Sequence, residues 1–248
     1  MLILALDTTT RAGSCALARD GRVIREVASD PGKSHAEHLP GDLVTLIESE
    51  RLALDEIDVF AVATGPGSFT GLRVGIATLQ GLAFAMQKPL IGVSGLDALA
   101  AVAERLTGSG PGMTTRPSAA QDQSPRTRVA TWVDAWRGEV YAALYEGGRD
   151  VEPPTVEHPA AILDRHRRNG EETFFIGDGA GTFASLIRDT LGPQAVVADP
   201  ASPLLAGAIA LLADRTARSG EFPRPDAIRP LYVRRTDAEL TRDARTGQ

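Results

Sequence analysis

A glycine-rich turn at residues 65–71, with the sequence GPGSFTG, is the segment of the chain best suited to hold an anion. It follows an apolar run that predicts a buried strand and precedes a helix-length segment in which Arg73 is the only charge. Free backbone N–H groups at the start of a helix bind phosphate well. The turn lacks the lysine of a Walker loop, because Leu72 and Arg73 follow Gly71, and its glycine spacing does not match the dinucleotide pattern. The segment therefore indicates an incomplete phosphate loop.

Two aspartates occupy equivalent positions at the ends of two apolar runs. Asp7 follows residues 2–6, and Asp134 follows residues 129–133. In a two-lobed nucleotide-binding protein, such carboxylates would face a metal–phosphate complex across a cleft. Each could instead accept hydrogen bonds from the backbone of the turn that follows it. The candidate residues of this cleft, interpreted as a vestigial nucleotide site, are Asp7, Thr8, Asp134, Gly177, Asp178 and Gly179.

Two histidines, His35 and His38, stand three residues apart and would share one face of a helix, as metal ligands can. Zinc proteases differ, because their two histidines are four residues apart and glutamate directly follows the first. Ser34 and Glu37 match a capping box, which predicts the start of a helix. Pro40 then implies a kink or a later start. We therefore expect neither a metal nor a cofactor on this chain.

The helix predicted over residues 69–86 has an unusual composition, because small residues recur every four positions on it. They are Gly71 and Gly75, then Ala77, Gly81 and Ala85. Glycine inside a helix costs about 1 kcal/mol relative to alanine, so three glycines need a compensating reason. Close approach of another backbone would supply one, and so would burial in the core of the helix's own domain. The spacing alone does not distinguish the two.

The chain repeats one pattern of elements. An apolar strand ends at an aspartate, a second strand returns after a turn, and a helical segment leads to another strand with a glycine-rich elbow. The strands are predicted at residues 2–6, 14–18, 23–27 and 59–64, and again at 129–133, 139–145 and 174–176. Asp20-Gly21 between two of them predicts a hairpin turn. This arrangement predicts an α/β fold of two related lobes, each a mixed sheet flanked by helices.

Composition and charge restrict the function classes. The 248 residues carry a net charge of −6, which argues against a chain that grips nucleic acid unaided. The single cysteine, Cys15, indicates a reducing compartment and has no recognisable base partner for nucleophilic catalysis. The start MLILALD is typical of a strand rather than a signal peptide, and the longest uncharged apolar stretch, residues 74–87, is short for a membrane span. We expect a cytoplasmic protein without membrane contact.

One internal segment differs from the rest in composition. Residues 107–128 are rich in Gly, Pro, Ser and Thr and have few apolar side chains, which predicts a disordered insertion. The predicted domains are an N-terminal lobe at 1–106, this insertion, a smaller C-terminal lobe at 129–235 and a flexible tail at 236–248.

Six segments together resemble the bacterial TsaB (YeaZ) family. They are ALDTTT, SHAEHLPGDL, TGPGSFTGLRVGIATLQGLAF, VDAWRGEVYAALY, GDGA and RPLYVR, and the resemblance covers about residues 1–104 and 129–235. Proteins of this family are accessory subunits in the synthesis of threonylcarbamoyladenosine (t6A) in tRNA, and the resemblance implies their actin/Hsp70-like (ASKHA) fold. One departure is Trp136, where the family often has arginine.

The resemblance implies a non-catalytic role beside a larger paralogue of the TsaD type, which transfers the threonylcarbamoyl group to tRNA. It implies a heterodimer with TsaD through helices near 35–51 and 69–86, and a TsaE-type ATPase in the larger complex. It also implies tRNA contact only through that complex, and a homodimer when the chain is alone. The implied partner-binding residues are Leu39, Leu43, Leu46, Ser68, Phe69, Gly71, Arg73, Gly75, Thr78 and Leu82.

Two other functions stay open at this stage. A metal-dependent glycoprotease-type peptidase would need a bound metal, or a nucleophile with its base. A free-standing actin-like ATP-binding phosphotransferase would need to bind nucleotide without a partner. TsaD-type proteins hold their metal with an H-x-x-x-H motif, which this sequence lacks.

Overall fold

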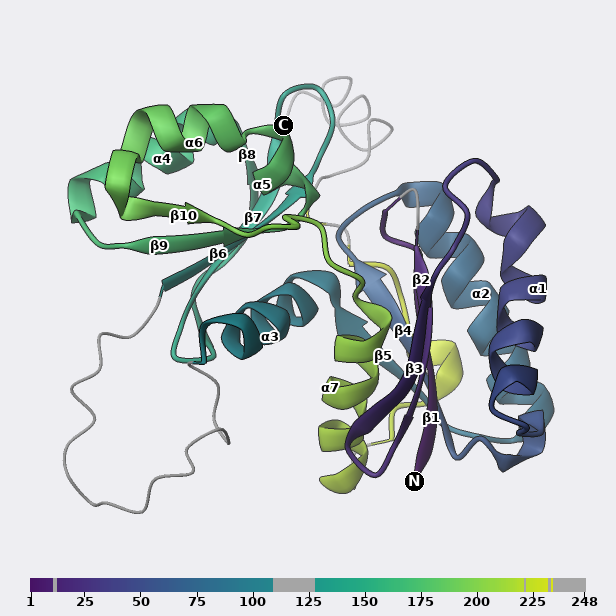
Figure 1. The fold of residues 1–248 in the computed structure, drawn as a ribbon. Coiled ribbons are helices and arrows are strands. Elements are labelled where there is room, and N and C mark those ends of the chain that lie inside the picture. The colour runs from purple at the N-terminus through teal and green to yellow at the C-terminus, as the bar shows by residue number, and fades with distance from the viewer. Residues whose placement is uncertain (11–12, 109–127, 221, 232, 234–248) are drawn as a thin grey trace, which may run out of the picture.

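The computed structural model of the chain describes residues 1–10, 13–108, 128–220, 222–231 and 233, which form two lobes (Figure 1). The sheet of the first lobe has the order β3-β2-β1-β4-β5. Its strands are β1 (Leu2–Asp7), β2 (Ser14–Arg19), β3 (Arg22–Ala28), β4 (Val59–Gly65) and β5 (Leu90–Ser94). Strands β1, β4 and β5 are parallel, whereas the pairs β1–β2 and β2–β3 are antiparallel. Asp20 and Gly21 both have positive φ between β2 and β3, as a tight hairpin requires.

The second sheet repeats the first, because its order β8-β7-β6-β9-β10 matches the first sheet strand by strand. Its strands are β6 (Arg128–Asp134), β7 (Val140–Glu146), β8 (Arg149–Glu157), β9 (Thr173–Ile176) and β10 (Ala195–Val197). The antiparallel pairs β6–β7 and β7–β8 and the parallel pairs β6–β9 and β9–β10 also correspond. The predicted α/β fold of two related lobes, each a mixed sheet flanked by helices, is confirmed.

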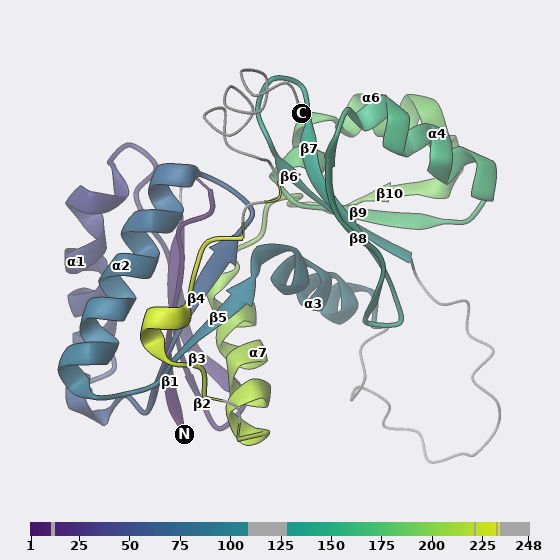
Figure 2. The ribbon, with the colours of Figure 1, turned by 180° about the vertical axis from the view of Figure 1, so that it is seen from behind.

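Helices cover both faces of the first sheet (Figure 2). Helices α1 (His35–Ser49) and α2 (Phe69–Met86) lie on one face, and α3 (Gly95–Thr107) and α7 (Ala206–Arg218) lie on the other. The second lobe contains α4 (Pro159–Asn169), α5 (Asp178–Thr182) and α6 (Ala184–Leu191). The 3₁₀ turns are η1 (Leu54–Glu56), η2 (Gly192–Gln194) and η3 (Pro225–Ala227). Because side chains alternate along a strand, Leu4 and Leu6 of β1 pack with α1 and α2, whereas Ile3 and Ala5 pack with α3 and α7. Helix α3 also contacts the second sheet, so one apolar cluster joins the lobes.

Helix α7 returns the chain to the first lobe. It packs against β1, β2, β4 and β5, and beyond it the Leu231 N–H donates to the Thr64 carbonyl at 2.7 Å. The structure therefore differs from the predicted C-terminal lobe at 129–235, because the described residues from Ala206 onward lie with the first sheet (Figure 1). Contacts between such distant segments leave no local pattern in the sequence.

The predicted insertion and tail fall mostly outside the described residues. Within the range 107–128, Thr107 ends α3, Gly108 follows it, and Arg128 begins β6. The remaining residues of that range and the tail at 236–248 are not among those described.

The N-terminus of α7 is capped by residues that lie far from it in the sequence. The Ser14 hydroxyl oxygen on β2 accepts hydrogen bonds from the backbone N–H groups of Leu205 (3.4 Å) and Ala206 (3.1 Å). A Glu26 carboxylate oxygen on β3 accepts another from Gly207 at 2.7 Å. These bonds satisfy N–H groups that the helix itself leaves unpaired. Strands β2 and β3 therefore fix the position of α7.

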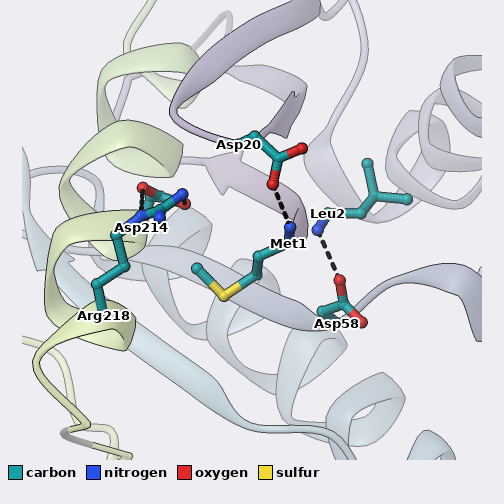
Figure 3. A network of polar contacts seen from close by, with 6 residues as sticks. All are labelled: Met1, Leu2, Asp20, Asp58, Asp214 and Arg218. Atoms are coloured by element: carbon teal, nitrogen blue, oxygen red, sulfur yellow. Dashed lines mark hydrogen bonds and ion pairs between the residues drawn. The ribbon is translucent and has the colours of Figure 1, made fainter.

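A second set of polar contacts lies near the other end of α7 (Figure 3). The Met1 amino group binds the Asp20 carboxylate at 2.5 Å, and the Leu2 N–H donates to Asp58 at 2.7 Å. On α7, Arg218 donates to both carboxylate oxygens of Asp214, at 2.6 and 3.2 Å. The first two contacts hold the start of β1 beside the β2–β3 turn and the approach to β4.

Helix α1 begins where the capping-box pattern predicts. The Glu37 carboxylate accepts hydrogen bonds from the Ser34 backbone N–H (2.8 Å) and hydroxyl (2.6 Å). The helix runs from His35 through Pro40, so it does not start after the proline as one of the two expectations had it. Pro40 has no N–H to donate to the preceding turn, which leaves the first turn less tightly coupled to the rest.

By length and hydropathy, α2 is the one helix of the described chain that would fit across a membrane. In this structure it packs against β1, β4 and α1. Core helices of globular proteins commonly pass the same test of composition.

We expect Ser14→Ala to lower the free energy of unfolding by about 1–2 kcal/mol, because two N–H groups at the buried start of α7 would lose their acceptor. Denaturant unfolding measures the change. Ser49→Ala is a matched control, since the Ser49 hydroxyl donates only to the Leu46 carbonyl within α1. Equal losses in the two variants would contradict the role assigned to Ser14.

His166 on α4 should make the stability of the protein sensitive to acid. Burial, and then the charges of Arg128 and Arg165, lower its pKa to about 4. The unfolded histidine has a pKa of about 6.5, so acid protonates the unfolded chain first, and the free energy of unfolding falls as pH drops from about 6.5 to about 4. His166→Leu should make the loss between about pH 7 and pH 5 smaller by about 1–2 kcal/mol, measured by unfolding at each pH. Identical pH profiles would show that His166 titrates normally in the folded protein.

Candidate functional site

Helix α2 and the turn before it lie directly against the residues at the end of β1. A Cβ atom on Gly71 would overlap the Thr8 carbonyl oxygen, and one on Gly75 would overlap the Thr8 hydroxyl. Just before the helix, a Cβ on Gly67 would overlap the Thr9 carbonyl, to which Ser68 N–H donates at 2.8 Å. The first half of the small-residue pattern is thus explained within the chain itself.

His35 joins α1 to this contact. Its ring lies between two glycines, because Cβ atoms on Gly13 and Gly71 would each be 3.0 Å from it. Its Nε2 donates to the Thr10 carbonyl at 3.0 Å, and burial lowers its pKa. His38 instead directs Nδ1 to the Asp42 carboxylate at 2.8 Å. The two imidazoles therefore each hydrogen-bond to a group of the protein itself.

A cleft of about 550 Å³ opens between the lobes, above this contact. Its walls are the first turns of α1 and α2, the β1–β2 connection and the ends of β6 and β9. The lining residues are Thr9, Thr10, Gly32, Lys33, Ser34, His35, Ala36, Ser68, Thr70, Gly71, Val74, Asp134, Trp136 and Asp178.

The predicted cleft residues divide into two groups. Asp134 and Asp178 line the cleft, whereas Asp7 lies beneath it and is 3% exposed. Thr8, Gly177 and Gly179 are likewise buried, the two glycines because β6 backbone passes directly against them.

The carboxylates of the cleft mainly serve the backbone. Asp7 accepts from the Thr9 N–H (2.8 Å) and hydroxyl (2.7 Å), yet burial still raises its pKa. Asp178 accepts from the N–H groups of Asp134 (3.0 Å) and Gly179 (2.9 Å), and burial raises its pKa as well. Asp134 accepts from the Trp136 N–H at 2.8 Å. Of the two readings of Asp7 and Asp134, the turn-capping one describes the contacts found.

Chemistry at other positions is restricted too. The described residues contain no group of three or more His, Cys, Asp or Glu side chains placed to hold a metal ion. Cys15 is buried, and burial raises the pKa of its thiol to about 12, which disfavours the reactive thiolate form.

A second hollow, of about 650 Å³, lies between α1 and α2 on the outer surface, and we call it the α1–α2 groove. It is mostly apolar, and Val44 beside it is 54% exposed. Gly81 lines the groove and is exposed, and a Cβ atom there would meet no atom within 4 Å. The lining residues are Pro40, Leu43, Val44, Ile47, Glu48, Leu52, Leu54, Ala77, Thr78, Gly81 and Leu82.

The ten predicted partner-binding residues occupy different environments. The α1–α2 groove is lined by Leu43, Thr78 and Leu82, and the cleft by Ser68 and Gly71. At the start of α2, two side chains are exposed, Phe69 and Arg73. The core contains the remaining three, Leu39, Leu46 and Gly75. These three line neither the groove nor the cleft. Their positions on α1 and α2 follow from helical periodicity, but periodicity did not show which turns face outward.

Sequence reasoning missed one wall of the groove. Leu52 and Leu54 come from the short connection between α1 and β4, where no helical period applies. The signal available was two leucines in RLALDE, a stretch of this link that is otherwise mostly polar. Exposed Phe84 on α2, 84% accessible, also went unassigned.

The comparisons with known proteins cover both lobes. The family model described as TsaD, tRNA N6-adenosine threonylcarbamoyltransferase, matches residues 17–231. The chain is 30% identical over 242 residues to the tRNA threonylcarbamoyladenosine biosynthesis protein TsaB of Escherichia coli, which covers 94% of this chain and 95% of that protein. The structure of YeaZ from Pseudomonas aeruginosa aligns with a TM-score of 0.69 and 30% identity, over 93% of this chain and 99% of that one.

A more distant structure shares the fold alone. Component A of (R)-2-hydroxyglutaryl-CoA dehydratase from Acidaminococcus fermentans aligns with a TM-score of 0.54 and 11% identity, over 88% of this chain and 99% of that one. It is consistent with two lobes of the actin-like (ASKHA) kind. The family model and the near-complete matches to E. coli TsaB and P. aeruginosa YeaZ show that the chain belongs to the TsaB (YeaZ) family.

Proposed function

We propose that this protein is a non-catalytic accessory subunit that supports t6A synthesis in tRNA by pairing with a TsaD-type transferase through the α1–α2 groove. The E. coli relative is named for threonylcarbamoyladenosine biosynthesis, and this name supports the process that we propose. The α1–α2 groove supports the surface through which we propose that the chain pairs.

Gly81 carries the proposal. Glycine in a helix costs about 1 kcal/mol relative to alanine. Gly71 and Gly75 have an internal reason for that cost, because Thr8 leaves no room for a side chain. No atom of the described structure lies within 4 Å of a Cβ placed on Gly81, and this exposed glycine lines an apolar groove. Close approach of a partner's helix would give it the missing reason.

Exposed apolar side chains on both helices support the same surface. Val44, which lines the groove, and Phe84, three residues after the lining residue Gly81, are each more than half exposed. Exposed apolar surface of this kind marks protein–protein contact in globular proteins.

The cleft supports the accessory role more than a phosphotransferase. A nucleotide's metal would need accessible carboxylates in both lobes, whereas Asp7 is buried and bonded to Thr9. Asp134 and Asp178 already accept backbone hydrogen bonds. In this proposal, catalysis and tRNA contact belong to the cytoplasmic complex, in which a TsaE-type ATPase also takes part, and the isolated chain uses the groove for self-association.

Gly81→Leu tests the groove. We expect pairing with a TsaD-type subunit to weaken at least tenfold, because the new side chain projects into the space that the partner would occupy in the groove. Titration calorimetry measures the affinity, and a modification assay with the TsaD-type, TsaE-type and adenylate-forming components measures t6A synthesis. The thermal midpoint should not fall, since a Cβ at this position meets open space.

Ala161→Leu is the matched control, because it adds a leucine to an exposed helical position on α4 in the other lobe. It should pair and support modification like the wild type. If Gly81→Leu also pairs normally, the groove is not the docking surface. If modification is complete without this protein, the accessory role itself is wrong.

A further inference from the structure

The α1–α2 groove contains one charged side chain. Among its lining residues, Glu48 on α1 is the only acid or base. Its carboxylate is exposed and has no hydrogen bond or ion pair with other residues of the described chain. The neighbouring acid Glu50, by contrast, lies 3.7 Å from Arg25.

The rest of the groove offers Glu48 no positive charge. The only charged residue of α2 is Arg73, whose guanidinium stacks over the Phe69 ring, 3.8 Å from its centroid, and does not line the groove. Exposed charges of both signs flank the lining, because Arg51 directly precedes Leu52 and Asp55 directly follows Leu54. The lining itself is therefore apolar apart from the single negative charge of Glu48.

This charge has different consequences for two possible occupants. A second copy of the chain would bring its own Glu48 to a shared two-fold interface and would contribute no lysine or arginine from its groove lining. Partly burying carboxylates without a counter-charge is unfavourable. A different subunit with a lysine or arginine opposite Glu48 would remove that penalty.

We propose that Glu48 is a specificity-determining residue, which makes the groove select a different subunit, one presenting an apolar helical face with a basic side chain opposite Glu48, over a second copy of this chain. The inference rests on the proposed pairing through the groove and adds the chemistry of the partner. Selection against the unwanted partner by an uncompensated charge is a general route to specificity.

Two variants separate the attractive and repulsive effects. Glu48→Lys should weaken pairing with the TsaD-type subunit about tenfold or more, because the new lysine would face the basic side chain of the partner. Glu48→Gln should strengthen self-association about tenfold, measured by sedimentation, because it removes the charge that the two copies share. Raising salt from about 50 to about 500 mM should weaken wild-type pairing more than Glu48→Gln pairing.

Glu172→Lys, an exposed acid of the second lobe, is the control and should leave both associations at wild-type strength. If Glu48→Lys and Glu48→Gln pair and self-associate like the wild type, the selectivity assigned to Glu48 is wrong, although the groove can still be the docking surface. If the wild type does not pair with a TsaD-type subunit at all, the proposed function fails, and the self-association of Glu48→Gln still tests the repulsion between copies.

Discussion

The contact between α2 and the end of β1 is the constraint on which the rest of the described structure depends. Thr8 lies so close to Gly71 and Gly75 that neither position can carry a side chain. The contact fixes the axis of α2 against the first sheet. It thereby sets one wall of the cleft, through the first turn of α2, and one wall of the α1–α2 groove, through its middle turns.

Local patterns predicted most of the repeated architecture. Both copies show an apolar run that ends in aspartate and a glycine elbow before a helix, and the first copy adds the Asp20-Gly21 hairpin. Strands β5, β8 and β10 were not predicted. The return of α7 to the first lobe could not be predicted in the same way. The hydrogen bond that caps α7 joins Ser14 to Ala206, which are 192 residues apart in the sequence. Because α7 has no N-cap side chain of its own, no local residue indicates where it begins. A helix that is capped by another segment looks uncapped in its own sequence.

The candidate site was predicted in outline, and two ambiguities needed the structure. Gly75 and Gly81 look alike in the sequence, yet one faces Thr8 and the other faces open space. Spacing identifies a helix face that tolerates close approach, but not whether the neighbour is internal. Asp7 and Asp134 are likewise equivalent by pattern, yet Asp7 is 3% exposed whereas Asp134 lines the cleft. Internal duplication conserves topology more closely than it conserves solvent access.

The same two helices serve the cleft at their first turns and the groove at their middle turns. His35 anchors the first turn of α1 between Gly13 and Gly71, so α1 is held against α2 from the cleft end. Pro40, which lines the groove, lacks the N–H that would tie it to that anchored turn. The end of the groove nearest the cleft is therefore held by His35, whereas α1 beyond Pro40 is less tightly tied to that end. A surface positioned before its partner arrives loses less conformational entropy on docking. In the proposed pairing, the same packing that buries Asp7 would therefore also hold the outer face of α1 and α2 in position for association.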